Sequence, residues 1–389
     1  MPARDGGCIA MNNVTQGLLK AGHDVQVLTI FTHKHDLEIN LLPAEYIEQT
    51  KIQGVFVDTS ISIVDAFSSL VTQDSYNISR FFTADFDIRL VQLLQNQKFD
   101  IIHLESLFMT PYIGTCRRYS KAKIVLRSHN LEHIIWEKVA GGTRSLPKRT
   151  YLKYLSRKLK EYELSVAGQV DGIASISAED EAKHISLGCA KPVVNIPFGI
   201  DMADYDKSES AQDEMKVFHL GSMDWTPNLE GILWFLEQVW PKVIAKTPSL
   251  TLYLAGRSMP RELLEGDYPN VEIFGEVSDA KEFMSGKSVM IVPLISASGV
   301  RVKIIEGMAL GKTIVSTPIG AEGIDHTNGE NILIAATGNE FAQVLHDLKN
   351  DSQRCAQIGR NAKQLAQQKF DNVLITENLI QFYKDLINR

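Results

Sequence analysis

The chain alternates short apolar runs rich in β-branched residues with longer stretches of helical period, and it does so in two successive series. Such alternation is typical of parallel sheets joined by helical crossovers, and it predicts an α/β fold. In the first series we expect strands over residues 24–30, 54–57, 99–104, 122–127, 172–176 and 192–196. In the second series we expect strands over residues 216–220, 250–255, 271–274, 288–294, 312–316 and 331–334.

Two series of strands also predict two domains, because 389 residues exceed what one hydrophobic core usually serves. A Pro/Gly turn and a polar run place the linker near residues 198–213. We expect an N-terminal domain over residues 1–200, a second domain over 201–370 and a C-terminal helix over 371–389.

The start of the chain departs from the usual doubly wound order. The helical pattern of residues 9–21 precedes every predicted strand, whereas such a domain normally begins with a strand. The first domain is therefore expected to lack its opening strand, either because the chain is truncated or because translation starts earlier.

Composition excludes several classes of protein. The net charge of −7 argues against a protein that holds nucleic acid through its phosphates. The four cysteines are far apart in the sequence, which favours free thiols in a reducing compartment over disulfides or a zinc site. No apolar run spans a bilayer and no signal-peptide core opens the chain, so we expect a cytoplasmic protein. H-E-x-x-H, P-loop and G-x-S-x-G motifs are absent from the sequence.

The first candidate site follows the strand that ends at Leu294. Small residues, among them Ser298 and Gly299, lead into a helix from about Val302, whose free N–H groups favour an anion. Arg301 and Lys303 add positive charge at that helix start, which is unfavourable unless an anion completes the site. An anion site and a turn with solvated basic residues both stay open.

Two further candidates lie beside predicted elements. His129 follows the strand over 122–127, at the edge where open α/β sheets bind ligands, although a lone histidine is more often structural. Gly7 precedes the first helix in a Gly-Gly pair, which is either a phosphate-facing turn or an ordinary chain terminus.

Another candidate follows the first strand of the second series. Gly221 and Ser222 come after this buried strand, which helix initiation alone does not explain. Thr226 is expected to cap the next helix, with Pro227 as its first residue.

A basic segment covers residues 144–160, which include seven Lys and Arg and no acid. Leu152, Leu155, Leu159 and Tyr162 fall at helical spacing beside these charges. Such a helix either lies on an anionic membrane or packs on its own domain with a solvated basic face.

Together these segments resemble the family-4 retaining glycosyltransferases of the GT-B fold, also called glycosyl transferases group 1. The resemblance runs through residues 5–25, 99–103, 127–130 and 196–201, and most specifically through 298–323. It implies two Rossmann-like domains facing across a cleft, with the C-terminal helix crossing back onto the first. It also implies retaining transfer from a nucleotide-sugar donor without a cofactor or bound metal.

The resemblance assigns roles to single positions. His129 would contact the transferred sugar near the reacting carbon, and Glu306 would bind the ribose hydroxyls of the donor. Arg301 and Lys303 would hold the diphosphate, helped by backbone N–H groups around Gly299 and by Gly7 across the cleft. The expected donor-binding set is Gly7, Ser298, Gly299, Val300, Arg301, Lys303 and Glu306, with Gly221 and Asn228 as secondary candidates.

Two departures from the family pattern bear on the donor. Ser298 stands where the family's paired-glutamate motif has its first Glu, so recognition of the sugar is not carried over. Ser222 and Asn228 replace the usual Arg and Lys after the first strand of the donor domain, which leaves more of the diphosphate to Arg301 and Lys303.

The resemblance implies a glycan or lipid-linked acceptor, bacterial surface polysaccharide synthesis as the setting, and no nucleic acid partner. Peripheral contact with an anionic membrane would follow from the basic segment. Two other functions stay open: a GT-B nucleotide-sugar epimerase, and an inert protein that only binds a nucleotide sugar.

Overall fold

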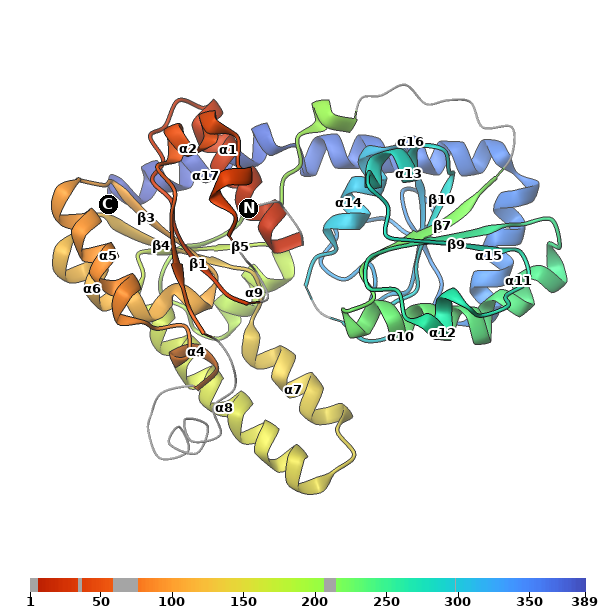
Figure 1. The fold of residues 1–389 in the computed structure, drawn as a ribbon, viewed down its shortest axis with the longest axis horizontal. Helices are drawn as coiled ribbons and strands as arrows, with labels where there is room; N and C mark the ends of the chain where they lie inside the picture. Colours follow the sequence, from red (N-terminus) through yellow and green to blue (C-terminus); the bar gives the residue numbers. More distant parts are fainter. Residues whose placement is uncertain (1–5, 34–36, 59–75, 206–214, 298) are drawn as a thin grey trace. The chain divides into compact units, whose positions relative to one another are not determined.

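The computed structural model describes residues 6–33, 37–58, 76–205, 215–297 and 299–389, and the chain divides into two compact units (Figure 1). Unit 1 comprises Met1–Pro197 and Ile375–Arg389, and unit 2 comprises Phe198–Leu374. The last residues of the chain thus belong to the same unit as the first.

Unit 2 is built on a six-stranded parallel sheet with the order β12-β11-β10-β7-β8-β9. The neighbours of β7 are β8 on one side and β10 on the other, so the chain order reverses between β7 and β10. Open α/β sheets bind ligands at such a switch point, beyond the carboxyl ends of the strands. The strands are Val217–Leu220 (β7), Leu252–Ala255 (β8), Val271–Gly275 (β9), Val289–Val292 (β10), Thr313–Ser316 (β11) and Leu333–Ile334 (β12).

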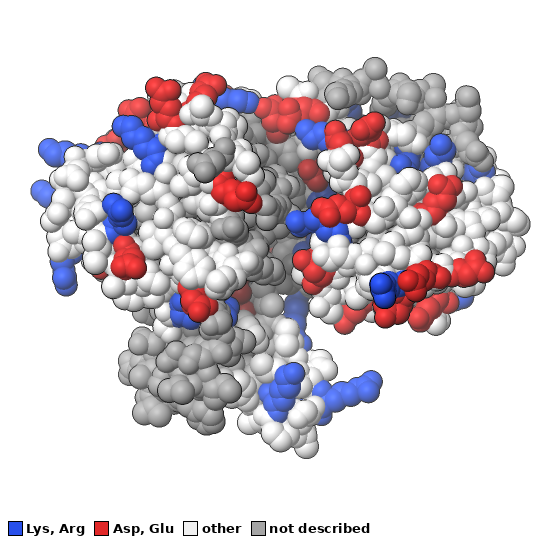
Figure 2. All heavy atoms as spheres, in the orientation of Figure 1, with Lys and Arg blue, Asp and Glu red and all other residues white. Residues whose placement is uncertain are grey.

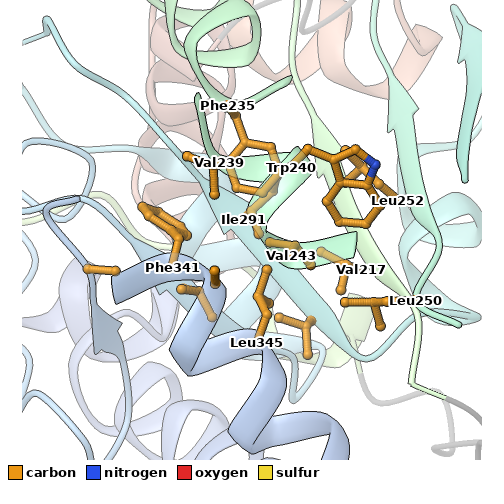
Figure 3. Close-up of a cluster of buried hydrophobic side chains, with 14 of the residues drawn as sticks. Val217, Phe235, Val239, Trp240, Val243, Leu250, Leu252, Ile291, Phe341 and Leu345 are labelled. Atoms are coloured by element: carbon orange, nitrogen blue, oxygen red, sulfur yellow. The ribbon is translucent and has the colours of Figure 1, made fainter. Parts of the chain in front are cut away.

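Helices cover both faces of this sheet. On one face Phe235, Trp240 and Phe341 pack with strand residues such as Ile291 in a buried cluster (Figure 3). The indole N–H of Trp240 donates to the carbonyl of Pro269 at 2.7 Å, which satisfies its polar edge. This face carries Thr226–Trp234 (α10), a π-helical turn over Phe235–Val239, Trp240–Lys246 (α11), Arg261–Leu264 (α12) and Gly338–Asn350 (α15); the other carries Ala280–Ser285 (α13), Val302–Ala309 (α14) and Ser352–Lys369 (α16).

Unit 1 contains two separate parallel sheets. Four strands pair in the order β3-β4-β5-β6, while β1 and β2 pair with each other in a two-stranded sheet. In the doubly wound order the first strand lies between the second and the fourth. Among the described residues no strand precedes the first helix. No described strand joins the two-stranded sheet to the four-stranded sheet. The strands are Leu28–Phe31 (β1), Gln53–Phe56 (β2), Ile101–Glu105 (β3), Lys123–Ser128 (β4), Gly172–Ser175 (β5) and Val193–Asn195 (β6).

The larger sheet of unit 1 is also covered on both faces. Val14, Leu379 and Phe382 pack on one face against β4 and β5, and Ile113, Cys116 and other residues pack on the opposite face. The helices are Gly6–Lys20 (α1), Ala44–Thr50 (α2), Tyr76–Ser79 (α4), Ala84–Asn96 (α5), Ile113–Tyr119 (α6), Ala178–Ser186 (α9) and Asn372–Ile387 (α17), with 3-10 turns over Ile39–Leu41, Leu107–Tyr112 and, in unit 2, Met202–Tyr205.

Two helices of unit 1, Glu132–Gly142 (α7) and Leu146–Gln169 (α8), form a hairpin that extends away from the sheet (Figure 1). Glu163 on α8 holds the start of α7, because its carboxylate accepts hydrogen bonds from the backbone N–H groups of Glu132 at 2.8 Å and His133 at 3.2 Å. Leu152 and Leu159 are buried, so the predicted apolar stripe packs on its own unit.

Every predicted strand overlaps an observed one, and the predicted α/β class is confirmed. Two local predictions are wrong. Gly6 and Gly7 lie inside α1 rather than in a turn ahead of it. Thr226 is the first residue of α10 rather than its cap; Trp225 takes the cap position without a side-chain bond, and Pro227 still falls in the first turn, where its missing N–H is not needed.

Candidate functional site

The strongest candidate site lies in unit 2, at the switch point between β7 and β10. After β10 the chain passes through Gly299, whose φ of 84° lies in the left-handed region that glycine adopts without strain. Arg301 then takes the N-cap position of α14. The helix N-terminus and its cation are therefore both placed beyond the carboxyl end of β10.

Lys303 joins this helix to the segment that follows β7. Its ammonium donates a hydrogen bond to Oδ1 of Asn228 at 2.9 Å, while Nδ2 of Asn228 donates to the carbonyl of Ser222 at 2.8 Å. A Cβ atom at Gly221 would lie 2.8 Å from Nδ2 of Asn228, so a larger residue at this position would crowd the amide. The structure thus brings the secondary candidates Gly221 and Asn228 together with Lys303.

Two cations are held at this site away from bulk water. Arg301 is buried with its Cζ atom 5.3 Å from the centre of the Trp225 ring, and burial lowers the pKa of its guanidinium to about 10, against the attraction of Glu322. Burial, and then the charge of Arg301, lower the pKa of Lys303 to about 7. An anion between them would relieve both desolvation and mutual repulsion.

Glu306 lies one turn after Lys303 on the same face of α14. Both residues are half-buried, whereas Ile304 and Ile305 between them are fully buried in the core. The phenol of Tyr205 donates a hydrogen bond to Oε1 of Glu306 at 3.0 Å. Burial raises the pKa of Glu306, while this hydrogen bond and Lys281 act in the opposite direction.

Three donor candidates remain. Val300 is half-buried and packs against the core of unit 2. Ser298 lies outside the described residues, and Gly7 lies in α1 of unit 1. Unit 2 therefore contains the predicted donor residues Gly221, Asn228, Gly299, Val300, Arg301, Lys303 and Glu306.

His129 lies in unit 1, just beyond the carboxyl end of β4. Its Nε2 atom is 2.7 Å from Oε2 of Glu105, which ends the neighbouring strand β3. Glu105 and Tyr205 were not expected from the sequence. For Glu105 a signal existed: it directly follows the strand predicted over 99–104, and His129 follows the next predicted strand along the chain, over 122–127.

Among the described residues, no group of three or more His, Cys, Asp or Glu side chains could hold a metal ion. The basic side chains of the unit 2 site suit an anionic ligand rather than a cation.

Family models match both parts of this chain. The model of Glycosyltransferase Family 4 matches residues 6–204, and that of Glycosyl transferases group 1 matches residues 214–351. The chain belongs to glycosyltransferase family 4. The second match contains the whole run from Gly221 to Glu306, and the first contains Glu105 and His129. This family-4 chain is thus a glycosyltransferase, as the resemblance implied.

A curated relative of this family-4 glycosyltransferase comes from Klebsiella pneumoniae and is described as an uncharacterized 44.6 kDa protein in cps region. It is 24% identical over 392 residues, which cover 98% of this chain and 96% of the relative.

Solved structures share the fold. Sucrose-phosphate synthase from Thermosynechococcus elongatus superimposes with a TM-score of 0.72 at 16% identity, over 99% of this chain and 94% of that one. Anabaena HepE in complex with UDP and glucose has a TM-score of 0.66 at 16% identity, over 98% and 96%. The predicted GT-B fold is confirmed.

Of the helices described in this family-4 chain, none is long and apolar enough to cross a membrane.

Proposed function

We propose that this protein is a retaining glycosyltransferase that moves a sugar from a nucleotide-diphosphate sugar to a glycan or lipid-linked acceptor. The observation that carries the proposal is the cluster of Arg301, Lys303, Asn228 and Glu306 at the switch point of unit 2. Similarity to HepE, which was solved with UDP and with UDP-glucose, supports a nucleotide-sugar donor.

Two parts of the donor, the diphosphate and the ribose, have matching groups at this site. Arg301 and Lys303 supply two cations and α14 supplies its N-terminal N–H groups, which suit a diphosphate. Glu306 supplies a carboxylate one turn away, which suits the ribose hydroxyls. In unit 1, His129 would meet the transferred sugar, and Gly7 would complete the donor site.

In the proposed reaction the bond from the anomeric carbon to the diphosphate oxygen breaks, and its electron pair stays on the diphosphate. The acceptor hydroxyl bonds to the same face of the carbon and its proton passes to the leaving diphosphate oxygen, so the configuration is retained. Arg301 and Lys303 would stabilise the charge that grows on the leaving diphosphate, and we propose that no metal is needed for this.

The test is turnover of UDP-glucose and other nucleotide sugars, with and without a glycan acceptor. Release of nucleotide only when the acceptor is present supports the transferase. Interconversion of the sugar without an acceptor would indicate the epimerase instead. Nucleotide binding, detected as a raised melting temperature, with no turnover in any mixture would indicate an inert binding protein.

We also propose a cytoplasmic setting in bacterial surface polysaccharide synthesis, with peripheral contact at the inner face of the membrane. The relative in a cps region supports the pathway. Eight Lys and Arg and no acid between Lys138 and Lys160, at the end of the α7–α8 hairpin, support the membrane contact. On the face drawn in Figure 2, basic side chains gather at the end of this hairpin.

A further inference from the structure

The carboxylate of Glu105 lies at the centre of a polar group at the carboxyl edge of the unit 1 sheet. It closes β3, and in the parallel register Glu105 pairs with Arg127 on β4, two residues before His129. Its Oε2 atom is 2.7 Å from Nε2 of His129 and 3.9 Å from Nε of Arg127. Its Oε1 atom is 3.3 Å from Nε2 of His103.

These neighbours keep the carboxyl of Glu105 ionised. Burial alone would raise its pKa, but His103, His129 and Arg127 together hold that pKa well below the usual range. An ionised carboxylate accepts hydrogen bonds and donates none. The contact with His129 therefore requires the proton of the imidazole on Nε2.

A second histidine, His103, lies beside the other carboxylate oxygen of Glu105. Nδ1 of His103 lies 2.5 Å from the hydroxyl of Tyr383 on α17. Burial, followed by the charge of Glu105, raises the pKa of Tyr383, so the phenol remains protonated and can donate to this nitrogen. The proton of His103 then lies on Nε2, toward Oε1 of Glu105. Both carboxylate oxygens thus face an N–H group.

We propose that Glu105 is the positioning residue of His129, fixing the imidazole as the Nε2–H tautomer and holding it in one orientation where it would meet the transferred sugar. The side chains of His129 and Glu105 are 17% and 20% exposed, so the pair borders solvent rather than lying sealed in the core. This inference rests on the proposed role of His129 at the sugar. If Glu105 and His129 formed only a structural ion pair, the tautomer of His129 would not have to be fixed, and loss of Glu105 would not have to slow turnover.

The tautomer can be measured without any substrate. Nitrogen NMR of the full chain with 15N-labelled histidine, assigned with a His129→Gln variant, should show His129 protonated on Nε2. Glu105→Ala should convert this signal to a mixture of tautomers, and the exposed control Glu179→Gln should leave it unchanged. A wild-type His129 protonated on Nδ1, or a signal that Glu105→Ala leaves unaltered, would overturn the proposal.

Kinetic measurements distinguish a positioning role of Glu105 from a role in folding. Glu105→Gln keeps the shape of the side chain and should lower kcat by about 10- to 100-fold, the range seen for carboxylates that orient metal-bound histidines. Nucleotide affinity should not change. In a His129→Ala background the same substitution should cost nothing further, because the two residues act as one unit. Equal losses in both backgrounds would contradict the proposal. Full activity of His129→Ala would refute the proposed sugar contact, and the NMR result would still decide the tautomer.

Discussion

The ammonium of Lys303 donates a hydrogen bond to Oδ1 of Asn228 at 2.9 Å, which ties the start of α14 to the first turn of α10 across the switch point of unit 2. The amide of Asn228 carries no charge, so this hydrogen bond does not neutralise the ammonium of Lys303. The positive charge is therefore available to a bound anion.

The first prediction concerns this pair. Lys303→Ala should weaken UDP-glucose binding by about 10- to 150-fold, since hydrogen bonds to charged groups contribute about 1.5–3 kcal/mol. Asn228→Ala removes only the orienting contact and should cost about tenfold or less. Calorimetry measures both, with the exposed Lys242→Ala as control. Affinity unchanged in Lys303→Ala and in a matching Arg301→Ala variant would leave these cations without a phosphate role.

Donor binding should also depend on pH. The pKa of Lys303 is lowered to about 7, so in the free protein the side chain loses its charge as pH rises through neutrality. A bound diphosphate favours the ammonium, hence affinity should fall above about pH 7, by at most roughly tenfold per unit. Below pH 7 the side chain is already charged and affinity should level off.

Lys303→Arg is the matched control, because a guanidinium remains charged throughout this range. Its affinity should stay nearly flat from pH 6 to 8.5. The same pH slope in wild type and in Lys303→Arg would assign the titration to another group.

The position of the donor candidates was predictable in part. Arg301, Lys303 and Glu306 lie within about one and a half turns at the start of the same helix, so local spacing brings them together. The bond from Lys303 to Asn228 joins residues 75 positions apart and depends on β10 pairing beside β7. Strand order is a property of the whole sheet, and no local pattern encodes it.

The sequence predicts which helices and strands form better than it predicts the residues at which they begin and end. A strand such as Val289–Val292 stands out because its buried run has no polar interruption. The start of α10 differs by one residue from its prediction, because a capping side chain contributes only about 1 kcal/mol. Glu105 and His129 were missed as a pair, because their contact again depends on adjacent strands β3 and β4.

Glu306 should contribute to binding more than to the chemical step. Its proposed ribose contact changes little during reaction, so Glu306→Gln should raise the donor Kd while turnover of the bound complex falls much less. Tyr205→Phe removes the hydrogen bond that orients the carboxylate and should weaken donor binding by a smaller factor of about 2 to 10. The control is Tyr268→Phe in the same unit. If Glu306→Gln slows the bound complex as much as it weakens binding, the ribose assignment is wrong.

The hairpin of unit 1 should bind anionic lipid through charge and through its exposed end rather than through the buried stripe of α8. Leu146 is 73% exposed and Tyr151 is 39% exposed, beside Lys148 and Arg149, whereas Leu152 is buried. Each basic residue near an anionic surface contributes about 1 kcal/mol, screened by salt. Vesicles containing phosphatidylserine should therefore retain the protein at low salt and release it at high salt.

Two variants and a control test this surface. Lys148→Glu with Arg149→Glu should abolish vesicle sedimentation of the protein, and Leu146→Ser should weaken it about tenfold or less, since full burial of a leucine contributes about 1.5–3 kcal/mol and the lipid contact is partial. The control pairs Lys242→Glu with Arg261→Glu, two exposed positions of unit 2. If this control pair reduces binding as much as the hairpin pair does, the attraction is a general charge effect. If the wild-type protein does not bind anionic vesicles at any salt concentration, the basic face of α8 is exposed to solvent and has no membrane role.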